Sequence, residues 1–163
     1  MKLKRLGLGL MLCSSMILGA CHNLKIEDNP NEKTKAVSVA NKYLNAFFQG
    51  DIEKAMAMSN TPFWGDGHIL ETEPLLRKEL EGQLKGNRKH PPGFTVESTA
   101  FFTLSQIKLL APKVYKRLET KNFMPQNMFA VVISINMQGR SEKGLIFMQK
   151  QTDGMWKVVG IDD

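Results

Sequence analysis

Apolar residues recur every three or four positions after residue 33, which is the spacing of one face of a helix. The segment EKTKAVSVANKYLNAFFQGD follows this pattern and reaches Gly50, a residue typical of the position just after a helix. Asp51 then suits the N-cap of a second, short helix, IEKAMAMS. A third helix is predicted in ETEPLLRKELEGQL, where Pro74 fits the first turn and the leucines share one face. The segment KGNRKHPPG after it is expected to be a loop.

The period changes to two from Phe94 onward, which indicates strands. One face of the first strand is predicted to carry Phe94, Val96, Ala100, Phe102 and Leu104, with Phe101 as the exception. Three more strands are predicted in MFAVVISINM, EKGLIFMQK and MWKVVGI. The segment APKVYKRLETKNFMPQ is ambiguous, and we predict a loop with one helical turn there.

Tight-turn dipeptides separate the predicted strands. Gln138-Gly139 and Asp153-Gly154 lie between the last three strands, and Asp66-Gly67 lies inside FWGDGHIL. Aspartate and glycine tolerate the positive φ angles that the favoured hairpin turns require. We therefore also expect a brief strand or hairpin around Asp66.

Three helices followed by about four antiparallel strands predict an α+β domain, with the helices packed on one face of a curved sheet. Residues 34–163 have the length of a single domain. A domain of this size buries about two thirds of its unfolded surface, so it requires no disulfides.

The first twenty residues are typical of a secretory signal. Lys2, Lys4 and Arg5 precede an apolar run from Leu6 to Ala20 that contains several glycines and serines. A membrane-spanning helix needs about 20 apolar residues, so this run is too short to be one. The basic start and the small residues at its end predict that residues 1–20 are a cleaved signal peptide.

Leu18-Gly19-Ala20-Cys21 resembles a bacterial lipobox, in which the thiol of the cysteine takes a diacylglycerol. Two or more acyl chains on Cys21 would make a stable membrane anchor. The alternative is a plain signal peptide with a chance cysteine. Residues 21–33 are then the lipidated cysteine and a polar tether, with Asn29-Pro30-Asn31 as a breaker. In the lipoproteins that this resembles, an acidic residue after the cysteine retains the protein at the inner membrane. His22 stands there, so we expect an outer-membrane protein that faces the periplasm.

Charge and cysteine content narrow the function classes. Cys13 lies in the signal peptide and lipid occupies Cys21, so no disulfide or cysteine-based metal site is expected. Removal of the signal peptide lowers the formal net charge from +6, leaving 19 basic and 16 acidic residues. This balance, in an exported protein, predicts no nucleic-acid partner. Two basic clusters are expected to be solvated faces, with attraction to anionic lipid headgroups as the alternative: Lys85, Arg88 and Lys89, and Lys113, Lys116, Arg117 and Lys121.

Three segments, YLNAFFQGDIEKAMAMS, FWGDGHIL…LLRKEL and GLIFMQKQTDGMWKVVGID, together resemble the nuclear-transport-factor-2-like superfamily. This superfamily contains the ketosteroid isomerases and is also described as cystatin-like. The resemblance covers residues 36–162. The members that the chain resembles most are small exported lipoproteins that carry such a domain. The resemblance implies a cone-shaped fold with an apolar pocket between sheet and helices. Some members catalyse reactions there with buried Asp, Tyr or His, whereas many only bind ligands or partners, and the fold does not choose between these roles.

Few residues suggest catalysis. Tyr43 is expected to be a core tyrosine with its hydroxyl at the edge, Asp66 a turn residue, and Asp162 a solvated residue. His68 is expected to be a surface or edge residue, and the alternative is an acid or base at the mouth of the pocket, because imidazole titrates near neutral pH.

The sequence predicts no metal site and no cofactor. His22, His68 and His90 do not have the spacing of metal ligands. The chain also has no glycine-rich phosphate loop and no Gly-x-Ser-x-Gly turn.

The sequence favours a non-enzymatic, lipid-anchored envelope protein that binds an apolar ligand, a lipid or a protein partner. The predicted pocket residues are Tyr43, Phe47, Trp64, Phe102 and Met148. One alternative is an isomerase or dehydratase that uses Asp66 and His68. Another is a structural or interaction domain that forms a homodimer through its sheet.

Overall fold

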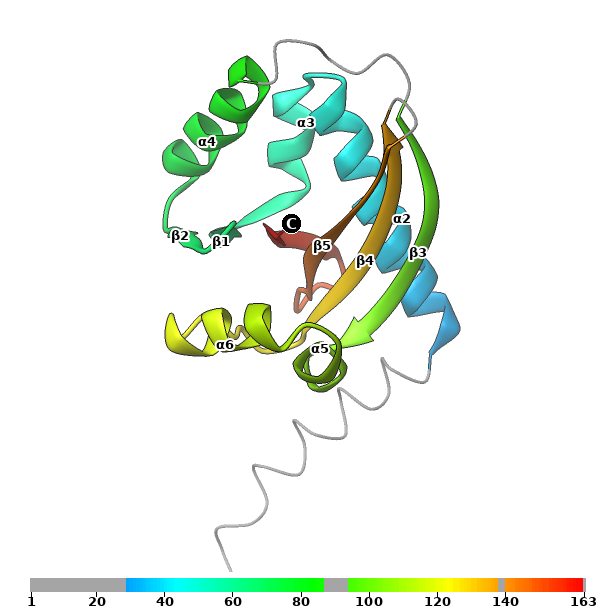
Figure 1. The fold of residues 1–163 in the computed structure, drawn as a ribbon. Coiled ribbons are helices and arrows are strands. Elements are labelled where there is room, and N and C mark those ends of the chain that lie inside the picture. The colour runs from blue at the N-terminus through cyan, green and yellow to red at the C-terminus, as the bar shows by residue number, and fades with distance from the viewer. Residues whose placement is uncertain (1–28, 87–93, 138–139, 163) are drawn as a thin grey trace, which may run out of the picture.

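The computed structural model describes residues 29–86, 94–137 and 140–162 (Figure 1). The helices are α2 (Pro30–Phe48), α3 (Ile52–Ala57), α4 (Glu73–Gly86), α5 (Leu104–Leu110) and α6 (Pro112–Thr120). The strands are β1 (Ser59–Gly65), β2 (His68–Leu70), β3 (Phe94–Thr103), β4 (Met128–Met137), β5 (Arg140–Lys150) and β6 (Trp156–Asp162). This arrangement confirms the predicted α+β class. None of these helices is both long enough and apolar enough to cross a membrane.

Several predicted features lie outside the described residues. They are the signal peptide, Cys21, most of the polar tether, His22, His90, Arg88, Lys89 and the Gln138-Gly139 turn. The predictions that depend on them are therefore not tested by the fold.

The described strands form one mixed, six-stranded sheet in the order β2-β1-β6-β5-β4-β3. The predicted number of strands, about four, was too low, because β1 and β2 join the same sheet. The antiparallel hairpin of β1 and β2 adds to the edge of β6, and β1 runs parallel to β6. The sheet curves around α2, as Figure 1 shows.

Helix α2 starts four residues earlier than the predicted domain boundary at residue 34. The side-chain oxygen of Asn29 caps it by accepting hydrogen bonds from the backbone N–H groups of Asn31 and Glu32. Pro30 fits the first turn because the N–H that proline lacks would have no partner inside the helix. The Asn29-Pro30-Asn31 segment therefore begins a helix here and does not act as a breaker.

The main core lies between α2, α3, α4 and one face of the sheet. Ala36, Ala40, Tyr43 and Phe47 recur on one side of α2, as the sequence predicts, and are buried. The sheet side of this core consists of Phe63, Phe129, Val131, Ile133, Ile146, Met148, Trp156 and Val158. Alternate residues of each strand reach this core because side chains of a strand point to opposite faces in turn.

Strand β3 corrects the predicted alternation. Its pairing with β4 shifts between Val96 and Ser98, which marks a bulge. After the bulge the faces exchange, so Phe101 packs against the same core as Val96, whereas Phe102 packs on the other face. Leu104 lies outside the strand and begins α5.

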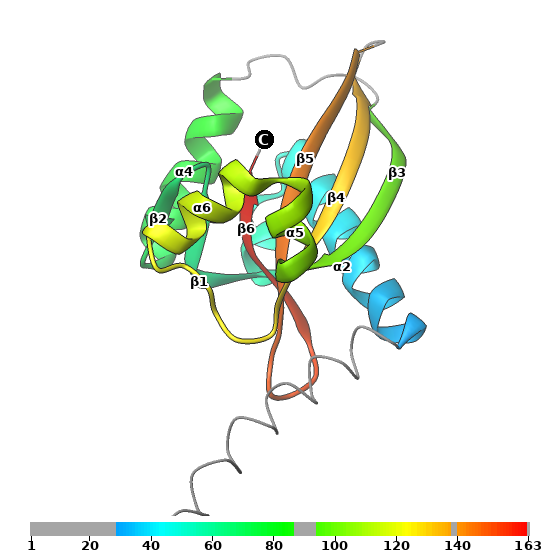
Figure 2. The ribbon, with the colours of Figure 1, turned by 60° about the horizontal axis from the view of Figure 1, so that its bottom comes forward.

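Helix α6 replaces the predicted loop with one helical turn, and α5 precedes it in a segment where no helix was predicted. The hydroxyl of Thr103 accepts from the N–H of Gln106, and the Gln106 side chain accepts from the N–H of Thr103, which forms a capping box. Pro112 begins α6. Both helices cover the second face of the sheet (Figure 2), where Ile107 and Leu118 join a second cluster with Trp64, Phe123, Met128, Ala130, Phe147 and Val159.

Candidate functional site

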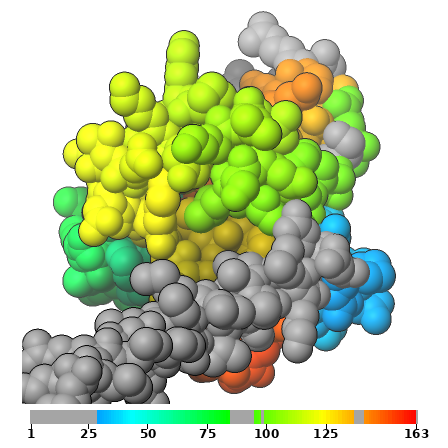
Figure 3. Space-filling model, turned by 90° about the horizontal axis from the view of Figure 1, so that it is seen from below, coloured from blue at the N-terminus to red at the C-terminus, as the bar shows by residue number. Residues whose placement is uncertain are grey.

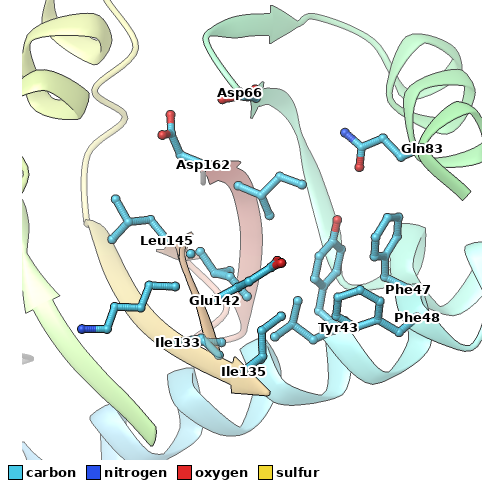
Figure 4. A pocket seen from close by; sticks show the side chains of 15 residues that line it. Tyr43, Phe47, Phe48, Asp66, Gln83, Ile133, Ile135, Glu142, Leu145 and Asp162 are labelled. Carbon is cyan, nitrogen blue, oxygen red and sulfur yellow. The ribbon is translucent and has the colours of Figure 1, made fainter. Parts of the chain in front are cut away.

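A pocket of about 510 Å³ lies between α2, α4 and the concave side of the sheet (Figure 4). Its volume falls within the range of about 300–1,000 Å³ that is common for small-molecule sites. Its apolar side chains are Tyr43, Leu44, Phe47, Phe48, Ile133, Ile135, Leu145, Ile146 and Ile161. Its polar side chains are Asp66, Gln83, Glu142, Lys143 and Asp162.

Helical and strand periodicity bring the apolar walls together. Tyr43 and Phe47 are four residues apart on α2, so they lie on one face, and their rings are nearly parallel with centroids 6.4 Å apart. Ile133 and Ile135 are alternate residues of β4 and face the same side of the sheet. The pocket is therefore a continuation of the main core toward one end of the sheet.

The hydroxyl of Tyr43 is the unusual polar group in this pocket. Tyr43 is fully buried, and its hydroxyl has no hydrogen-bond partner among the described residues. The sequence predicted a hydroxyl at the edge of the core, which was wrong. Figure 4 shows the hydroxyl directed into the space between α2 and the sheet. Burial raises the pKa of Tyr43 above its ordinary value, so the hydroxyl remains a hydrogen-bond donor at neutral pH.

Asp162 is buried, not solvated as the sequence predicted. Its side chain is fully covered because β6 lies inside the sheet, between β1 and β5. Nε1 of Trp64 donates a hydrogen bond of 2.7 Å to one carboxylate oxygen, and Nη2 of Arg117 donates one of 2.5 Å to the other. Buried charges in proteins are normally paired in this way.

Arg117 connects this buried carboxylate to the turn between β1 and β2. Its Nη1 lies 3.7 Å from Asp66, whose side chain is largely exposed. Asp66 and Gly67 both have positive φ, 43° and 91°, which confirms the predicted tight turn. The guanidinium therefore joins α6 to both aspartates at the polar end of the pocket.

The structure does not bring Asp66 and His68 together in the pocket. Asp66 lines it, whereas His68 is exposed at the start of β2 and pairs through its backbone position with Gly65. An acid–base pair must converge on one reacting group. The isomerase or dehydratase hypothesis based on these two residues thus lacks the geometry that it requires.

The five predicted pocket residues divide between three places. Tyr43 and Phe47 line the pocket. Met148 is buried in the main core, and Trp64 and Phe102 belong to the cluster on the second face of the sheet. Trp64 follows Phe63 on one strand, so only one of these two neighbouring aromatic residues can face the pocket side.

The pocket residues that the sequence analysis missed are chiefly Leu44, Phe48 and Ile135. A signal for Ile135 was available, because the alternation along β4 places it on the same face as Ile133. In contrast, the contribution of Gln83 from α4 depends on how that helix packs. Within the described ranges, no group of three or more His, Cys, Asp or Glu side chains is placed to hold a metal ion.

A second, shallower pocket of about 350 Å³ follows α6. It is lined by Gly67, Lys113, Lys116, Arg117, Thr120 and Lys121. These residues include one of the basic clusters singled out in the sequence, and its four basic members are all exposed.

In sequence comparisons the chain matches no protein-family model, and no curated protein matches it. Solved structures do match. A cystatin-like protein of unknown function from Nostoc punctiforme PCC 73102 aligns with a TM-score of 0.53 at 10% identity, over 82% of this chain and 90% of that one. A cystatin-like fold protein from Burkholderia xenovorans LB400 aligns with a TM-score of 0.51 at 14% identity, over 83% and 92%.

A protein predicted to be a ketosteroid isomerase, from Shewanella frigidimarina NCIMB 400, has a TM-score of 0.52 at 11% identity, over 78% of this chain and 93% of that one. The fold is cystatin-like. This result confirms the fold that the resemblance to the nuclear-transport-factor-2-like superfamily implies. At such low identities the similarity concerns the fold alone, so function has to be argued from the pocket.

Proposed function

We propose that this chain is an exported, lipid-anchored protein whose domain binds an apolar ligand without catalysing a reaction. The ligand occupies the pocket between α2, α4 and the sheet. The observation that carries this proposal is the buried hydroxyl of Tyr43, which has no partner among the described residues and lies beside the apolar wall of the pocket. A buried donor without a partner costs about 1–3 kcal/mol, and a ligand acceptor would remove that cost.

The polar groups of the pocket define the ligand further. Tyr43 donates a hydrogen bond, so the ligand carries an acceptor such as a carbonyl oxygen. Asp66, Glu142 and Asp162 are acidic, whereas Lys143 is the one basic residue among those that line the pocket. This imbalance favours a neutral acceptor over a carboxylate, because like charges repel.

The arrangement of the acidic groups supports binding over catalysis. Asp162 is held by Trp64 and Arg117, and the side chain of Asp66 is mostly in solvent beside the same arginine. Both carboxylates therefore form ion pairs with the same guanidinium, and their role in this proposal is structural.

The matched test for the pocket uses two neutral probes that differ in one carbonyl. Acetylnaphthalene carries an acceptor, and ethylnaphthalene has nearly the same shape without it. The whole chain is titrated with each probe. Tyr43→Phe should raise the dissociation constant for acetylnaphthalene by about fivefold to tenfold, which corresponds to the loss of one hydrogen bond. Binding of ethylnaphthalene should not change.

Equal losses for both probes would mean that the hydroxyl makes no hydrogen bond to the ligand. Absence of binding by both probes would contradict the apolar pocket itself. The control is Phe48→Ala, which removes an apolar side chain from the pocket wall and leaves the Tyr43 hydroxyl in place. It should weaken the binding of both probes to the same extent.

Lipid attachment at Cys21 is tested separately. Metabolic labelling with a fatty-acid probe, followed by mass spectrometry of the N-terminal peptide, should find two or more acyl chains on Cys21. Cys21→Ser should abolish labelling, and Cys13→Ser should leave it intact because Cys13 is removed with the signal peptide. A product that keeps residues 1–20 without lipid overturns the anchor but leaves the pocket proposal standing.

A further inference from the structure

We propose that α5 and α6 form a docking surface for an anionic phospholipid bilayer. The surface is made by Leu109 and Leu110 together with Lys108, Lys113, Lys116 and Lys121. The inference goes beyond the ligand pocket, and one of its arguments rests on the lipid attachment proposed for Cys21.

The apolar part of this surface is two adjacent leucines on α5. Leu109 is 82% exposed and Leu110 is 61% exposed, whereas Ile107 on the inner side of the same helix is fully buried. Scattered exposed leucines are ordinary, but here two adjacent leucines at the end of one short helix are both largely exposed. The acyl region of a bilayer is a medium that such side chains can enter.

The charge around the leucines complements a bilayer that contains acidic lipids. Between residues 104 and 121 the chain has five basic side chains and one acidic side chain, Glu119. Helical spacing places Lys113 and Lys116 opposite Leu118, which faces the core. Anionic headgroups attract such lysines within about a Debye length of the membrane surface.

The hollow beside α6 adds a place for a headgroup. Lys113, Lys116 and Lys121 line it together with Arg117, and its volume is about 350 Å³. In this proposal a lipid phosphate enters the hollow and accepts hydrogen bonds from the ammonium groups.

The start of α2 lies on the same face of the molecule. Figures 1 and 3 show the beginning of α2 on the side where α5 and α6 lie, together with the turn between β5 and β6. That turn carries Met155, a further exposed apolar side chain. The nine residues from Cys21 to Asn29 reach roughly 30 Å at most. A lipid on Cys21 would therefore hold the start of α2, and the face on which it lies, within that distance of the bilayer.

A second copy of the chain is a poorer occupant. A two-fold contact would place the same patch on both sides, so the basic residues of α5 and α6 would meet like charges. A bilayer with acidic lipids instead compensates these charges.

Tryptophan quenching by brominated acyl chains tests the proposal in the whole chain, reconstituted in vesicles of phosphatidylethanolamine and phosphatidylglycerol. Leu109→Trp is compared with Leu75→Trp, since Leu75 is also exposed, at 48%, but lies on α4. The unsubstituted chain supplies the background from the buried Trp64 and Trp156. The tryptophan at 109 should be quenched several times more strongly than the one at 75.

Charge dependence provides the second measurement. When Leu109→Trp is combined with Lys113→Glu and Lys116→Glu, quenching of the tryptophan at 109 should fall toward the level seen for Leu75→Trp. When Leu109→Trp is combined with Lys113→Arg and Lys116→Arg, the quenching should remain high. Vesicles of phosphatidylcholine alone should also reduce it.

Equal quenching at 109 and 75 overturns the proposal, as does failure of the chain to remain with the vesicles. If the tryptophan at 109 becomes shielded without vesicles as the protein concentration rises, the face is a contact between copies and the bilayer assignment is wrong. Labelling at Cys21 and probe binding at Tyr43 are measured independently, so their failure can be told apart from this one.

Discussion

The indole of Trp64 donates a 2.7 Å hydrogen bond to the carboxylate of Asp162, a residue 98 positions further along the chain. Both side chains are buried. The bond joins β1 to β6, the parallel pair of strands that attaches the β1–β2 hairpin to the rest of the sheet. Arg117 binds the second oxygen of the same carboxylate from α6, so one aspartate holds two strands and a helix together.

Asp162→Ala is expected to lower the free energy of unfolding by about 2–3 kcal/mol, because the buried indole N–H loses its acceptor. The freed Arg117 is nearly half exposed and can be solvated, which keeps the loss below that of a fully buried ion pair. Asp162→Asn should cost less, since its amide oxygen can still accept from Trp64. Urea unfolding measures both, and Glu119→Ala on exposed α6 is the control, expected within about 0.5 kcal/mol of the unsubstituted chain.

Gly160→Ala is expected to destabilise the fold by about 1–3 kcal/mol, the usual cost of overpacking. A Cβ at this position would lie 2.6 Å from Cβ of Trp64 and 2.9 Å from its carbonyl oxygen. Gly82→Ala is the matched control on α4, where nothing lies within 4 Å of the added atom. Alanine there should stabilise by about 0.5–1 kcal/mol, because it is the better helix former. Equal thermal midpoints for the two variants would contradict the close approach of β1 and β6.

Tyr43→Phe is expected to raise the free energy of unfolding of the ligand-free protein by about 1 kcal/mol or more. The substitution removes a buried hydroxyl that has no partner among the described residues and keeps the ring that stacks on Phe47. The same variant should lose affinity for the carbonyl probe, so stability and binding change in opposite directions. A destabilised Tyr43→Phe would show that the hydroxyl has a partner in the folded protein.

Glu32 should make the stability depend on pH in the acid range. Hydrogen bonds from Lys150 and Lys35 lower the pKa of Glu32 from 4.5 to about 2, and Trp156 also donates to it. A lowered folded pKa means that the stabilisation is complete above pH 4.5 and is lost as the pH falls through about 2. The contribution is at most about 3 kcal/mol.

Glu32→Gln should therefore remove most of this acid dependence when unfolding is followed by circular dichroism between these pH values. Glu53 is the comparison, because its pKa is also lowered, by Arg77, but the pair is on the surface. Glu53→Gln should change the profile little. Superimposable profiles for the unsubstituted chain and Glu32→Gln would rule out the role of Glu32.

Helices α2, α3 and α4 and the strands from β3 to β6 could be predicted because each has a local signature, either helical or two-residue periodicity. Helices α5 and α6 also had signatures. Thr103 and Gln106 have the spacing of a capping box, and Pro112 fits the first turn of a helix. Reading Thr103 as part of the strand pattern concealed the first of these signals.

The polar end of the pocket could not be predicted in the same way. Trp64, Arg117 and Asp162 come from three distant parts of the chain and meet only when β1 pairs with β6. No local pattern specifies a parallel pairing across almost a hundred residues. The sequence also left open which face of the sheet the Trp64 side chain occupies, because its neighbour Phe63 is equally apolar. Only the packed structure shows that Phe63 faces the main core and Trp64 the opposite face.

The position of β6 inside the sheet governs the order in which the chain can fold. The hairpin of β1 and β2 is made early in synthesis, yet its neighbour in the sheet is the strand latest in the sequence. Until that strand is available, β1 has an open edge and Trp64 has no acceptor. Contacts of such large sequence separation form slowly. The sheet of this chain can therefore be completed only after its last strand has been synthesised.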